Sequence, residues 1–403
     1  MAPSGVTPGF ATTANRPVGA GPAAIDPVGD PARDPALVRL VEQVRAARGR
    51  KATLEIRGGG TKAFYGEPAR GGEPLSLREL AGISSYEPSE LVVTVRAGTP
   101  LAELEAALAE KNQCLAFEPP RYGTAGGIAP GTAGGTVGGM VAAGLSGPAR
   151  AAVGGVRDFV LGASLLNGRA EVLSFGGQVM KNVAGYDVSR LLAGSLGVLG
   201  VILEVSLKVL PRPPATTTLR FELDEVEALN RLNAWGGQPL PLNASAWWER
   251  ALVVRLAGAA AAVQAAAKKL GGEVIEPGLA DTFWRGLRDH RDEFFSSAEE
   301  AVKGSACLWR LSVPATTPPL NLPGEQLVEW GGAQRWLCTG VPAVAVREAA
   351  AAVGGHATLF RARDKSAGVF TPLAPPLARI HRELKRAFDP DRVFNPGRLY
   401  PDL

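Results

Sequence analysis

Glycine is concentrated in one half of this chain, and that concentration limits what the chain can fold into. The sequence has 50 glycines among 403 residues, and they crowd between positions 58 and 200. From Gly123 to Gly155 nearly every residue is Gly, Ala, Thr or Pro. Glycine permits positive φ angles and a close approach of the backbone to another group. Such a segment has too little bulk to form a core, so we expect a bound molecule to fill the space.

Length and composition exclude several classes of protein. A chain of 403 residues suits two domains, because single cores stop growing at about 250–300 residues. No run reaches the roughly 18 apolar residues of a membrane-spanning helix. The net charge of +4 is spread along the chain, which argues against nucleic-acid binding. The pI of about 9.0 is compatible with peripheral docking on a membrane.

The three cysteines indicate a cytoplasmic protein without a metal or iron–sulfur site. They lie far apart, at Cys114, Cys307 and Cys338, and lack the close spacing that such sites use. A small, odd number of cysteines suits a reducing compartment. Residues 1–33 are rich in Ala, Pro and Gly and poor in bulky apolar residues, so we expect a disordered tail there.

Residues 34–214 are expected to form a first domain of two subdomains. Apolar spacing predicts a helix over 34–48, and alternation predicts a strand over 52–57. A buried strand over 91–95 leads to Thr99-Pro100, which are expected to begin a helix, and these elements make a β–α subdomain. Antiparallel strands follow: a hairpin of 159–166 and 171–175 around Asn167-Gly168, and a long strand over 201–210 closed by prolines.

A second domain is expected over residues 215–388. Predicted strands at 217–223, 244–256, 306–313, 325–338 and 356–361 alternate with predicted helices near 226–235, 257–270, 281–295 and 343–353. This order favours an α+β domain with an antiparallel sheet and helices on one face. A last helix near 373–388 leads into residues 389–403, which we expect to form a rigid turn.

Two glycine loops in the first domain suit a diphosphate, which needs several converging backbone N–H donors. The first is Arg57-Gly58-Gly59-Gly60-Thr61-Lys62, directly after a predicted strand. The second runs from Thr132 to Gly139, with Ser146-Gly147 after it. Each loop by itself could be a structural turn, but two in one domain favour a dinucleotide. No G-x-G-x-x-G in a strand–turn–helix setting and no G-x-x-x-x-G-K-[ST] occurs, which disfavours a Rossmann NAD site and a P-loop.

Five motifs, in this order, resemble the FAD domain of vanillyl-alcohol-oxidase-type flavoproteins. They are Arg57 to Thr61, Thr136 to Gly139, Arg157-Asp158, Lys181 to Asp187 and Gly194 to Ile202. Within that family, Glu118 to Pro120, Val156 to Gly162, Phe175 to Tyr186 and Glu329 to Trp336 resemble the FAD-binding subunits of bacterial glycolate oxidases. The resemblance covers about residues 50–400 and implies a PCMH-type FAD-binding domain followed by an α+β cap that contacts substrate or partner. The end of the chain, 389–403, would return to the FAD domain.

The resemblance also implies which residues hold FAD. The first loop and the Thr136 loop would bind the diphosphate, and the segment ending at Ile202 would border adenine and ribose. The residues so assigned are Arg57, Gly58, Gly59, Gly60, Thr61, Pro119, Thr136, Val137, Gly138, Gly139, Ser146, Gly147, Lys181, Tyr186, Gly197, Gly200, Val201 and Ile202. Some family members bind FAD covalently through a histidine just after the first loop. Thr61 occupies that place here, so we expect non-covalent FAD.

Catalytic candidates are few. Related dehydrogenases of D-2-hydroxy acids carry an H-x-G-D-G-N-x-H metal and base motif, where this chain has Gly354 to Arg361 and keeps only His356. His356 is therefore the candidate base, with Arg310, Arg335 or Arg361 to bind a carboxylate. The alternative is a strand histidine among solvated arginines. His290 and His381 lie in charged helical stretches and are expected at the surface. No metal is expected.

Three functions remain open. As the resemblance implies, the chain could carry FAD beside a homologous catalytic FAD subunit and an iron–sulfur subunit, in a complex that oxidises glycolate to glyoxylate. It could instead be a self-sufficient FAD-dependent dehydrogenase of another small 2-hydroxy acid such as D-lactate, or a non-catalytic scaffold subunit. In each case we expect a cytoplasmic protein, with peripheral membrane attachment only through its complex.

Overall fold

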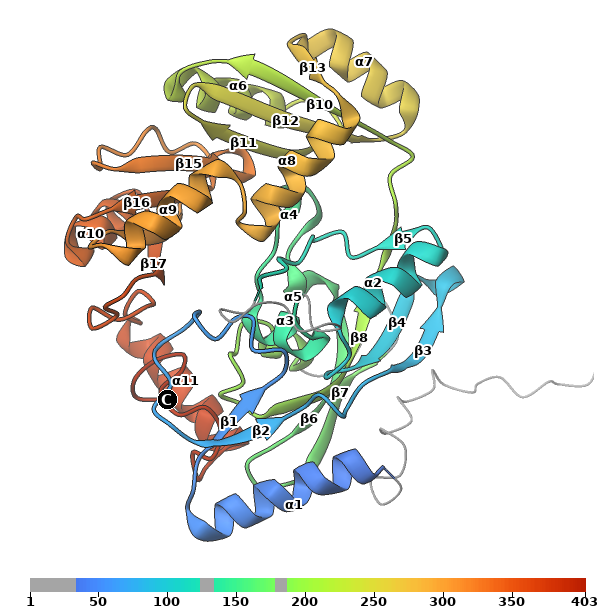
Figure 1. Cartoon of the computed structure of the whole chain (residues 1–403), viewed down its shortest axis with the longest axis vertical. Coiled ribbons are helices and arrows are strands. Elements are labelled where there is room, and N and C mark those ends of the chain that lie inside the picture. Colours follow the sequence, from blue (N-terminus) through green and yellow to red (C-terminus); the bar gives the residue numbers. More distant parts are fainter. Residues whose placement is uncertain (1–33, 124–133, 178–186) are drawn as a thin grey trace, which may run out of the picture.

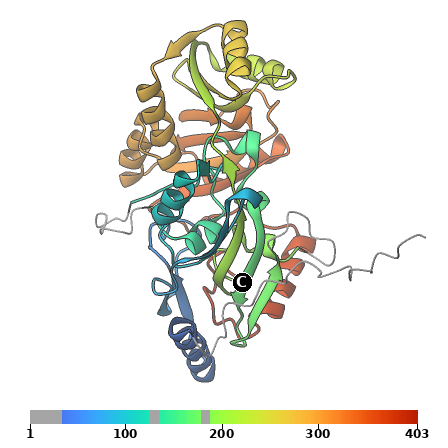
Figure 2. The same cartoon turned by 90° about the vertical axis from the view of Figure 1, so that its right-hand side faces the viewer.

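The computed structural model describes residues 34–123, 134–177 and 187–403. The expected tail at 1–33 lies outside these residues. Two sheets, one of five strands and one of eight, occupy opposite ends of the molecule, as both views show (Figures 1 and 2). Within the described residues, no helix is both long enough and apolar enough to cross a membrane.

The chain begins with helix α1 (Pro35–Arg50) and a small parallel sheet. The carboxylate of Asp34 caps the helix by accepting a 2.9 Å hydrogen bond from the amide of Ala36. The buried side of α1 consists of Leu37, Leu40, Val44 and Ala47. Strands β1 (Leu54–Arg57) and β2 (Glu73–Ser76) pair in parallel. The helix and the first strand that the sequence predicted are confirmed.

An antiparallel five-stranded sheet is the centre of the first domain. Its order is β3 (Ile83–Glu87), β4 (Val92–Arg96), β8 (Val201–Lys208), β6 (Val160–Leu166) and β7 (Val172–Gly176). The strand predicted at 91–95 was expected in the β–α subdomain, but β4 pairs with β8 in this sheet. Four of its five residues are buried, so it needs neighbours on both edges and cover on both faces. Helices α2 (Leu101–Glu110) and α3 (Val137–Ala143) contribute side chains to its core.

Several local expectations for this domain need correction. Thr99 does not cap α2: its hydroxyl donates to the carbonyl of Arg96 and accepts from the amide of Gly82. The hairpin of β6 and β7 is confirmed, but its loop has five residues and is organised by Asn167 Oδ1, which accepts from the amides of Arg169 and Glu171. Part of the small-residue stretch before 155 forms helix α3, which Thr136 caps and in which Ala and Met favour a helix.

Short elements complete the first domain. Helices α4 (Arg150–Val153) and α5 (Val156–Phe159) precede β6. Strands β5 (Gln113–Cys114) and β9 (Leu210–Pro211) pair beside α2.

Three 3₁₀ turns occur among the described residues: η1 (Pro88–Glu90) and η2 (Ser189–Leu192) in the first domain and η3 (Trp330–Gly332) in the second. Residues 124–133 and 178–186, which contain much of the expected glycine-rich chemistry, lie outside the described residues.

The second sheet is antiparallel and has eight strands. In spatial order they are β13 (Glu273–Ile275), β10 (Ala215–Glu222), β12 (Ala251–Gly258), β11 (Leu242–Trp248), β15 (Glu325–Glu329), β16 (Gln334–Thr339), β14 (Cys307–Ser312) and β17 (His356–Arg361). Its helices are α6 (Glu225–Gly236), α7 (Ala260–Leu270), α8 (Pro277–Asp289), α9 (Glu293–Lys303) and α10 (Ala343–Ala352).

These helices cover both faces of the sheet, and the expectation of one covered face is wrong. Along β12, Leu252 and Val254 pack with α6 and α7, whereas Val253 between them packs with α8 and α9. Successive strand residues point to opposite faces, so the two groups of helices lie on opposite sides. The face with α8 and α9 also receives Tyr65 and Tyr122 of the first domain.

Two strands and one helix that the sequence predicted in this domain are each divided by a turn into two elements. The strand expected over 244–256 is a hairpin that turns at Glu249 and Arg250, whose φ angles are 45° and 66°. The strand expected over 325–338 turns at η3. The helix expected over 281–295 is interrupted at His290, whose φ of 54° ends α8. The turn at η3 contains Gly331-Gly332, a turn signal that the prediction overlooked, whereas Glu249-Arg250 and His290 are not glycines and gave no such signal.

The end of the chain lies against the first domain. Helix α11 (Pro375–Phe388), which the sequence grouped with the second domain, packs Leu384 and Phe388 against the core of the first. The buried Lys385 ammonium donates to the carbonyls of Val198 and Phe394 and pairs with Asp389 at 2.7 Å. The backbone then bonds to β1, since the amide of Leu54 donates to Val393.

Candidate functional site: a glycine-walled cavity

A cavity of about 310 Å³ opens beside β1 in the first domain. Four segments line it: the first glycine loop, the start of α3, the turn before β8 and the end of the chain. The lining residues are Glu55, Ile56, Arg57, Gly58, Gly59, Gly60, Thr61, Lys62, Ala63, Tyr65, Leu77, Gly135, Thr136, Gly138, Gly139, Ala142, Ala143, Leu196, Gly197, Gly200, Ile202, Asn395 and Arg398. Eleven of the eighteen residues expected at an FAD site are therefore brought together.

The first glycine loop meets the second at the cavity wall. A Cβ on Gly59 would lie 3.0 Å from the Cα of Gly135, and a Cβ on Gly58 would lie 2.2 Å from Thr136 Oγ1. Gly60 has a φ of 73°. Among the described residues, the amides of Gly58 to Lys62 have no hydrogen-bond acceptor. Unpaired amides at glycines are what an anion requires.

The second loop contributes differently from expectation. The amide of Val137 donates to Thr99, that of Gly138 to Ala97, and that of Gly139 to Thr136 Oγ1. These donors are therefore engaged within the protein. A Cβ on Gly138 would lie 2.7 Å from the Cβ of Ala97, so this glycine lets α3 approach β4. The free donors of this segment among the described residues are the amides of Gly135 and Thr136.

The turn before β8 forms the third wall. Gly197 has a φ of 73°, and a Cβ there would lie 2.7 Å from Asn395 Nδ2. Gly200 faces the carbonyl of Leu166, which a Cβ would approach to 2.7 Å. Ile202 lines the cavity, whereas Val201 is buried and does not.

Other expected cofactor residues lie away from this cavity. Pro119 and Val137 are buried and do not line it. Ser146 Oγ accepts from the amide of Val156, and the carbonyl of Gly147 accepts from Trp330 Nε1 of the second domain. Both have structural partners. Lys181 and Tyr186 lie outside the described residues.

Four polar residues that line the cavity besides Tyr65 were not among the assigned cofactor residues: Glu55, Lys62, Asn395 and Arg398. Lys62 follows the first loop directly, so its position alone could have indicated it. Asn395 Oδ1 accepts from the amide of Ile56, while its Nδ2 donates to the carbonyl of Leu196. Arg398 donates to the carbonyls of Ala63, Tyr65 and Glu67. Asn395 therefore joins two cavity walls, which a simple terminal turn would not do.

The expected catalytic arginines have different environments. Arg335 is fully buried and donates to the carbonyls of Gly332, Thr317 and Pro318 and to Glu225. Four of its five N–H donors are engaged within its own domain, and its full burial keeps it from a substrate in this conformation. Arg310 is half-buried and donates to the hydroxyl of Tyr65 at 3.2 Å, which places it behind the cavity wall. His356 begins β17, is exposed, and does not line the cavity.

An aromatic cluster fills the space between the cavity and the second sheet. It comprises Phe64, Tyr65, Tyr122, His290, Phe295, Trp336 and Phe360. His290 was expected at the surface, but its ring stacks on Phe295 with centroids 3.7 Å apart. Burial, with Arg361 and Arg310 nearby, lowers the pKa of His290 well below its ordinary value. Burial raises the pKa of Tyr122, whose ring lies edge-on to His290.

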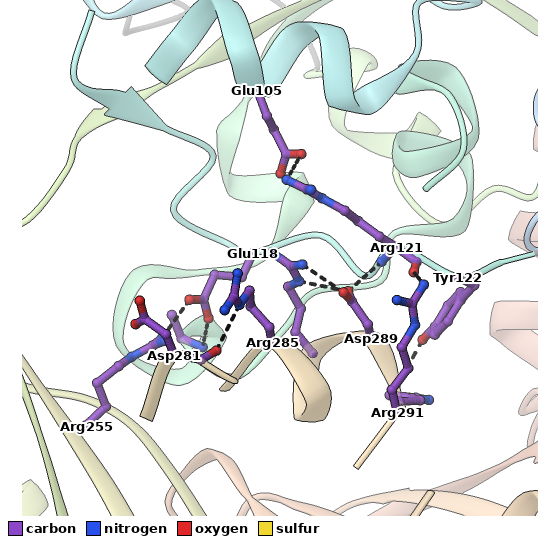
Figure 3. Close-up of polar contacts among 12 residues, drawn as sticks. Glu105, Glu118, Arg121, Tyr122, Arg255, Asp281, Arg285, Asp289 and Arg291 are labelled. Carbon is purple, nitrogen blue, oxygen red and sulfur yellow. Dashed lines mark hydrogen bonds and ion pairs between the residues drawn. The ribbon is translucent and has the colours of Figure 1, made fainter. Parts of the chain in front are cut away.

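Polar contacts join the loop before residue 123 to the second domain (Figure 3). The amide of Arg121 donates to Asp289 Oδ1 at 2.9 Å, and its guanidinium pairs with Glu105 of α2. Glu118 pairs with Arg255 of β12 at 2.7 Å and accepts from the amide of Ala149. The chain that leads to the second glycine loop is therefore fixed to both domains.

Comparison with known proteins identifies the family. A family model described as an FAD binding domain matches residues 39–176. The chain is 47% identical to glycolate oxidase subunit GlcE of Escherichia coli K12 over 367 residues, which are 90% of this chain and 97% of that protein. The chain belongs to the GlcE family. This confirms the expected kinship with glycolate oxidase subunits and FAD-linked oxidoreductases.

More distant relatives and solved structures agree. Glycolate oxidase subunit GlcD of Bacillus subtilis is 29% identical over 43% of this chain and 35% of its own length. A D-lactate dehydrogenase of Archaeoglobus fulgidus is 27% identical over 65% of this chain and 53% of its own length. The fold matches a solved alkyldihydroxyacetonephosphate synthase with a TM-score of 0.61 at 14% identity, covering 89% of this chain and 74% of that one. The expected fold class, a PCMH-type domain followed by an α+β domain with an antiparallel sheet, is confirmed.

Proposed function

We propose that this chain binds FAD non-covalently in the glycine-walled cavity, as a subunit of a glycolate oxidase complex that oxidises glycolate, a 2-hydroxy acid, to glyoxylate. One observation carries the proposal: the two glycine segments lie so close that a Cβ on Gly59 would be 3.0 Å from the Cα of Gly135, and the amides of Gly58 to Thr61 and of Gly135 are unpaired among the described residues. Ile56, Leu77, Ala142 and Ile202 supply an apolar lining beside them, as a dinucleotide requires.

Different walls of the cavity would hold different parts of FAD. The amides of the first loop hold the diphosphate. Gly197, Gly200 and Ile202 border the adenine and ribose. The attachment is non-covalent because Thr61 lines the cavity, while none of the three histidines of the sequence does. Bound flavin would supply the hydride acceptor, and this chain's residues would hold it and exclude water.

The chain is proposed to work with a homologous catalytic FAD subunit and an iron–sulfur subunit that takes up the electrons. Three observations support dependence on partners. The aromatic cluster occupies the space beside Tyr65, His356 is exposed away from the cavity, and Arg335 is engaged within its own domain. The relationship to GlcE and GlcD supports the same composition.

We also propose a location and domain limits for the chain. The proposed location is the cytoplasm, with attachment to the inner face of the membrane only through partner subunits. We also keep a domain boundary at residue 214, because β8 of the first sheet ends at Lys208 and β10 of the second begins at Ala215. The remaining limits are 215–388 for the cap and 389–403 for the returning turn.

Purification of the chain alone and with its partners tests the proposal. We expect the chain alone to be yellow, to keep its colour when glycolate or D-lactate is added, and to be bleached by glycolate only with the partners present. Bleaching of the isolated chain by substrate would identify a self-sufficient dehydrogenase, which its likeness to D-lactate dehydrogenases favours. A colourless chain that still assembles would identify a scaffold.

A further inference from the structure

Lys62 ends the first glycine loop and turns its side chain toward the second. Its carbonyl accepts a hydrogen bond from the amide of Tyr65, which fixes the backbone after the loop. A Cβ placed on Gly135 would lie 3.3 Å from Lys62 Nζ and 2.8 Å from Thr61 Oγ1. The ammonium and the hydroxyl therefore meet at one point of the cavity wall. Gly135, with a φ of 88° and no side chain, leaves that point open.

Neither donor has a protein acceptor among the described residues, where Lys62 and Thr61 form no side-chain hydrogen bond or ion pair. Lys62 Nζ lies over the ring of Tyr122, 5.7 Å from its centroid. Asp289 acts on Lys62 at longer range, but its carboxylate already accepts two hydrogen bonds from Arg288 and one from the amide of Arg121. The cavity wall is therefore left with an unneutralised cation.

An unpaired ammonium in such a place is costly unless an anion joins it. Burial lowers the pKa of Lys62 to about 8, because the charged form loses water, and Asp289 only partly offsets this. Arg361 also lies near the Tyr122 ring, 5.8 Å from its centroid, and Arg361 and Arg310 both act electrostatically on Tyr122, so positive charge gathers around this ring. A bound anion would remove the penalty and hold the ammonium charged.

We propose that Lys62 and Thr61 form a side-chain grip for the diphosphate of the bound dinucleotide, with Gly135 as the residue that leaves room for it. This inference rests on the proposed function. A diphosphate is favoured over the flavin ring, because both side chains lie beside the unpaired amides of the first loop and of Gly135. An ammonium, a hydroxyl and backbone amides together match the several oxygens of a diphosphate.

The test compares variants of the full chain after removal of its flavin. Lys62→Met keeps the length and loses the charge, Lys62→Arg keeps the charge, and Lys268→Met, on the exposed side of α7, is the matched control. Titration with FAD and with ADP measures two ligands that share a diphosphate, and titration with riboflavin measures one that lacks it. The midpoint potential of the bound flavin is measured in parallel.

We expect Lys62→Met to weaken FAD and ADP alike, by about 10- to 100-fold, which is the size of a charge-assisted hydrogen bond. Lys62→Arg restores most of the affinity, and Lys268→Met changes nothing. Riboflavin binding and the midpoint potential stay constant. An unchanged ADP affinity with a shifted potential would place Lys62 at the flavin ring and overturn the proposal, and so would an unchanged FAD affinity. A wild-type chain that binds no FAD would instead refute the proposed function.

A second variant and a pH series test the same proposal independently if Lys62→Met does not fold. Thr61→Val is expected to weaken FAD and ADP by about fivefold, the net value of one neutral hydrogen bond. Wild-type affinity is expected to fall as the pH rises through 8, because the ammonium loses its proton, and Lys62→Arg should remove this fall. The charged and titratable groups that face Lys62 are Asp289 and Tyr122, and His290, Arg310 and Arg361 stand next to Tyr122. A pH-independent wild-type affinity would contradict the grip.

Discussion

The glycine-walled cavity and the aromatic cluster lie next to each other, but the first is an open space lined mostly by small residues and the second is filled by packed rings. Only two residues separate Thr61, in the cavity wall, from Phe64, in the cluster. In the cavity wall, glycines present no side chain, and several backbone amides have no hydrogen-bond partner among the described residues. In the cluster, rings from both domains pack edge to face and one histidine is stacked flat on Phe295.

This contrast separates binding a cofactor from processing a substrate. A wall of unpaired donors is unfavourable without a ligand, so the cavity is built to be filled. The cluster is filled already, and its hydrophobic burial stabilises the contact between the domains. A chain with both features is suited to hold a flavin while a partner handles the substrate. Variants that affect one region and leave the other intact test this view.

The largest effect is expected from Gly59→Val. Its Cβ would press on the backbone of Gly135 at 3.0 Å, and the added methyl groups would push the loops apart. We expect complete loss of FAD, measured as flavin absorbance of the purified chain, with the second domain still folded. Gly49→Val is the control, since nothing lies within 4 Å of a Cβ there. Stoichiometric FAD in the Gly59 variant would show that the cavity is not the site.

Phe360→Ala removes the ring at the centre of the cluster. Phe360 is 0% exposed and contacts Phe64, Tyr65, Trp336 and His290. We expect the free energy of unfolding to fall by about 3–5 kcal/mol, measured by denaturant titration, with FAD affinity unchanged. Leu377→Ala, at an exposed site of α11, should cost little. If FAD affinity fell with the stability, the two regions would be coupled and the contrast would fail.

Glu329→Gln should change how stability depends on pH. Glu329 accepts hydrogen bonds from Trp336 Nε1 and Gln334 Nε2, and burial raises its pKa from 4.5 to about 7. The folded state therefore binds a proton that the unfolded state releases, and stability falls as the pH rises from about 4.5 through 7. A neutral glutamine avoids this loss, so the variant should melt higher than wild type at pH 8 but not at pH 5.

The expected gain at pH 8 is about 1 kcal/mol or more, which thermal unfolding can resolve. Glu222→Gln, on the exposed end of β10, serves as the control and should show no such dependence. Equal melting temperatures of wild type and Glu329→Gln at both pH values would mean that the Glu329 carboxylate is not destabilised by burial.

The smallest effect is expected from His356→Ala. Its side chain is exposed at the start of β17 and does not line the cavity. Turnover of glycolate by the assembled complex should be unchanged. A drop of about 100-fold or more, the contribution of a general base, would restore His356 as the proton acceptor and require that the domains rearrange.

Local signals in the sequence were sufficient for many elements. Apolar spacing identified α1, alternation identified β1, and the proline run marked the end of the long strand that became β8 and β9. They failed at the turns of Glu249-Arg250 and His290, where non-glycine residues take positive φ angles. Such angles persist only where the surrounding structure imposes them, and tertiary packing is not visible in a local pattern.

For the candidate site too, some features could be predicted from the sequence and others only from the tertiary structure. The glycine loops alone indicated a dinucleotide, because glycine content directly reports where a backbone must be approached closely. Only the folded chain showed that the amides of Val137, Gly138 and Gly139 are engaged, that Arg335 is fully buried, and that the cavity is closed by Asn395 and Arg398 from the end of the chain. Hydrogen-bond partners far apart in sequence are set by tertiary packing, so no local pattern specifies them.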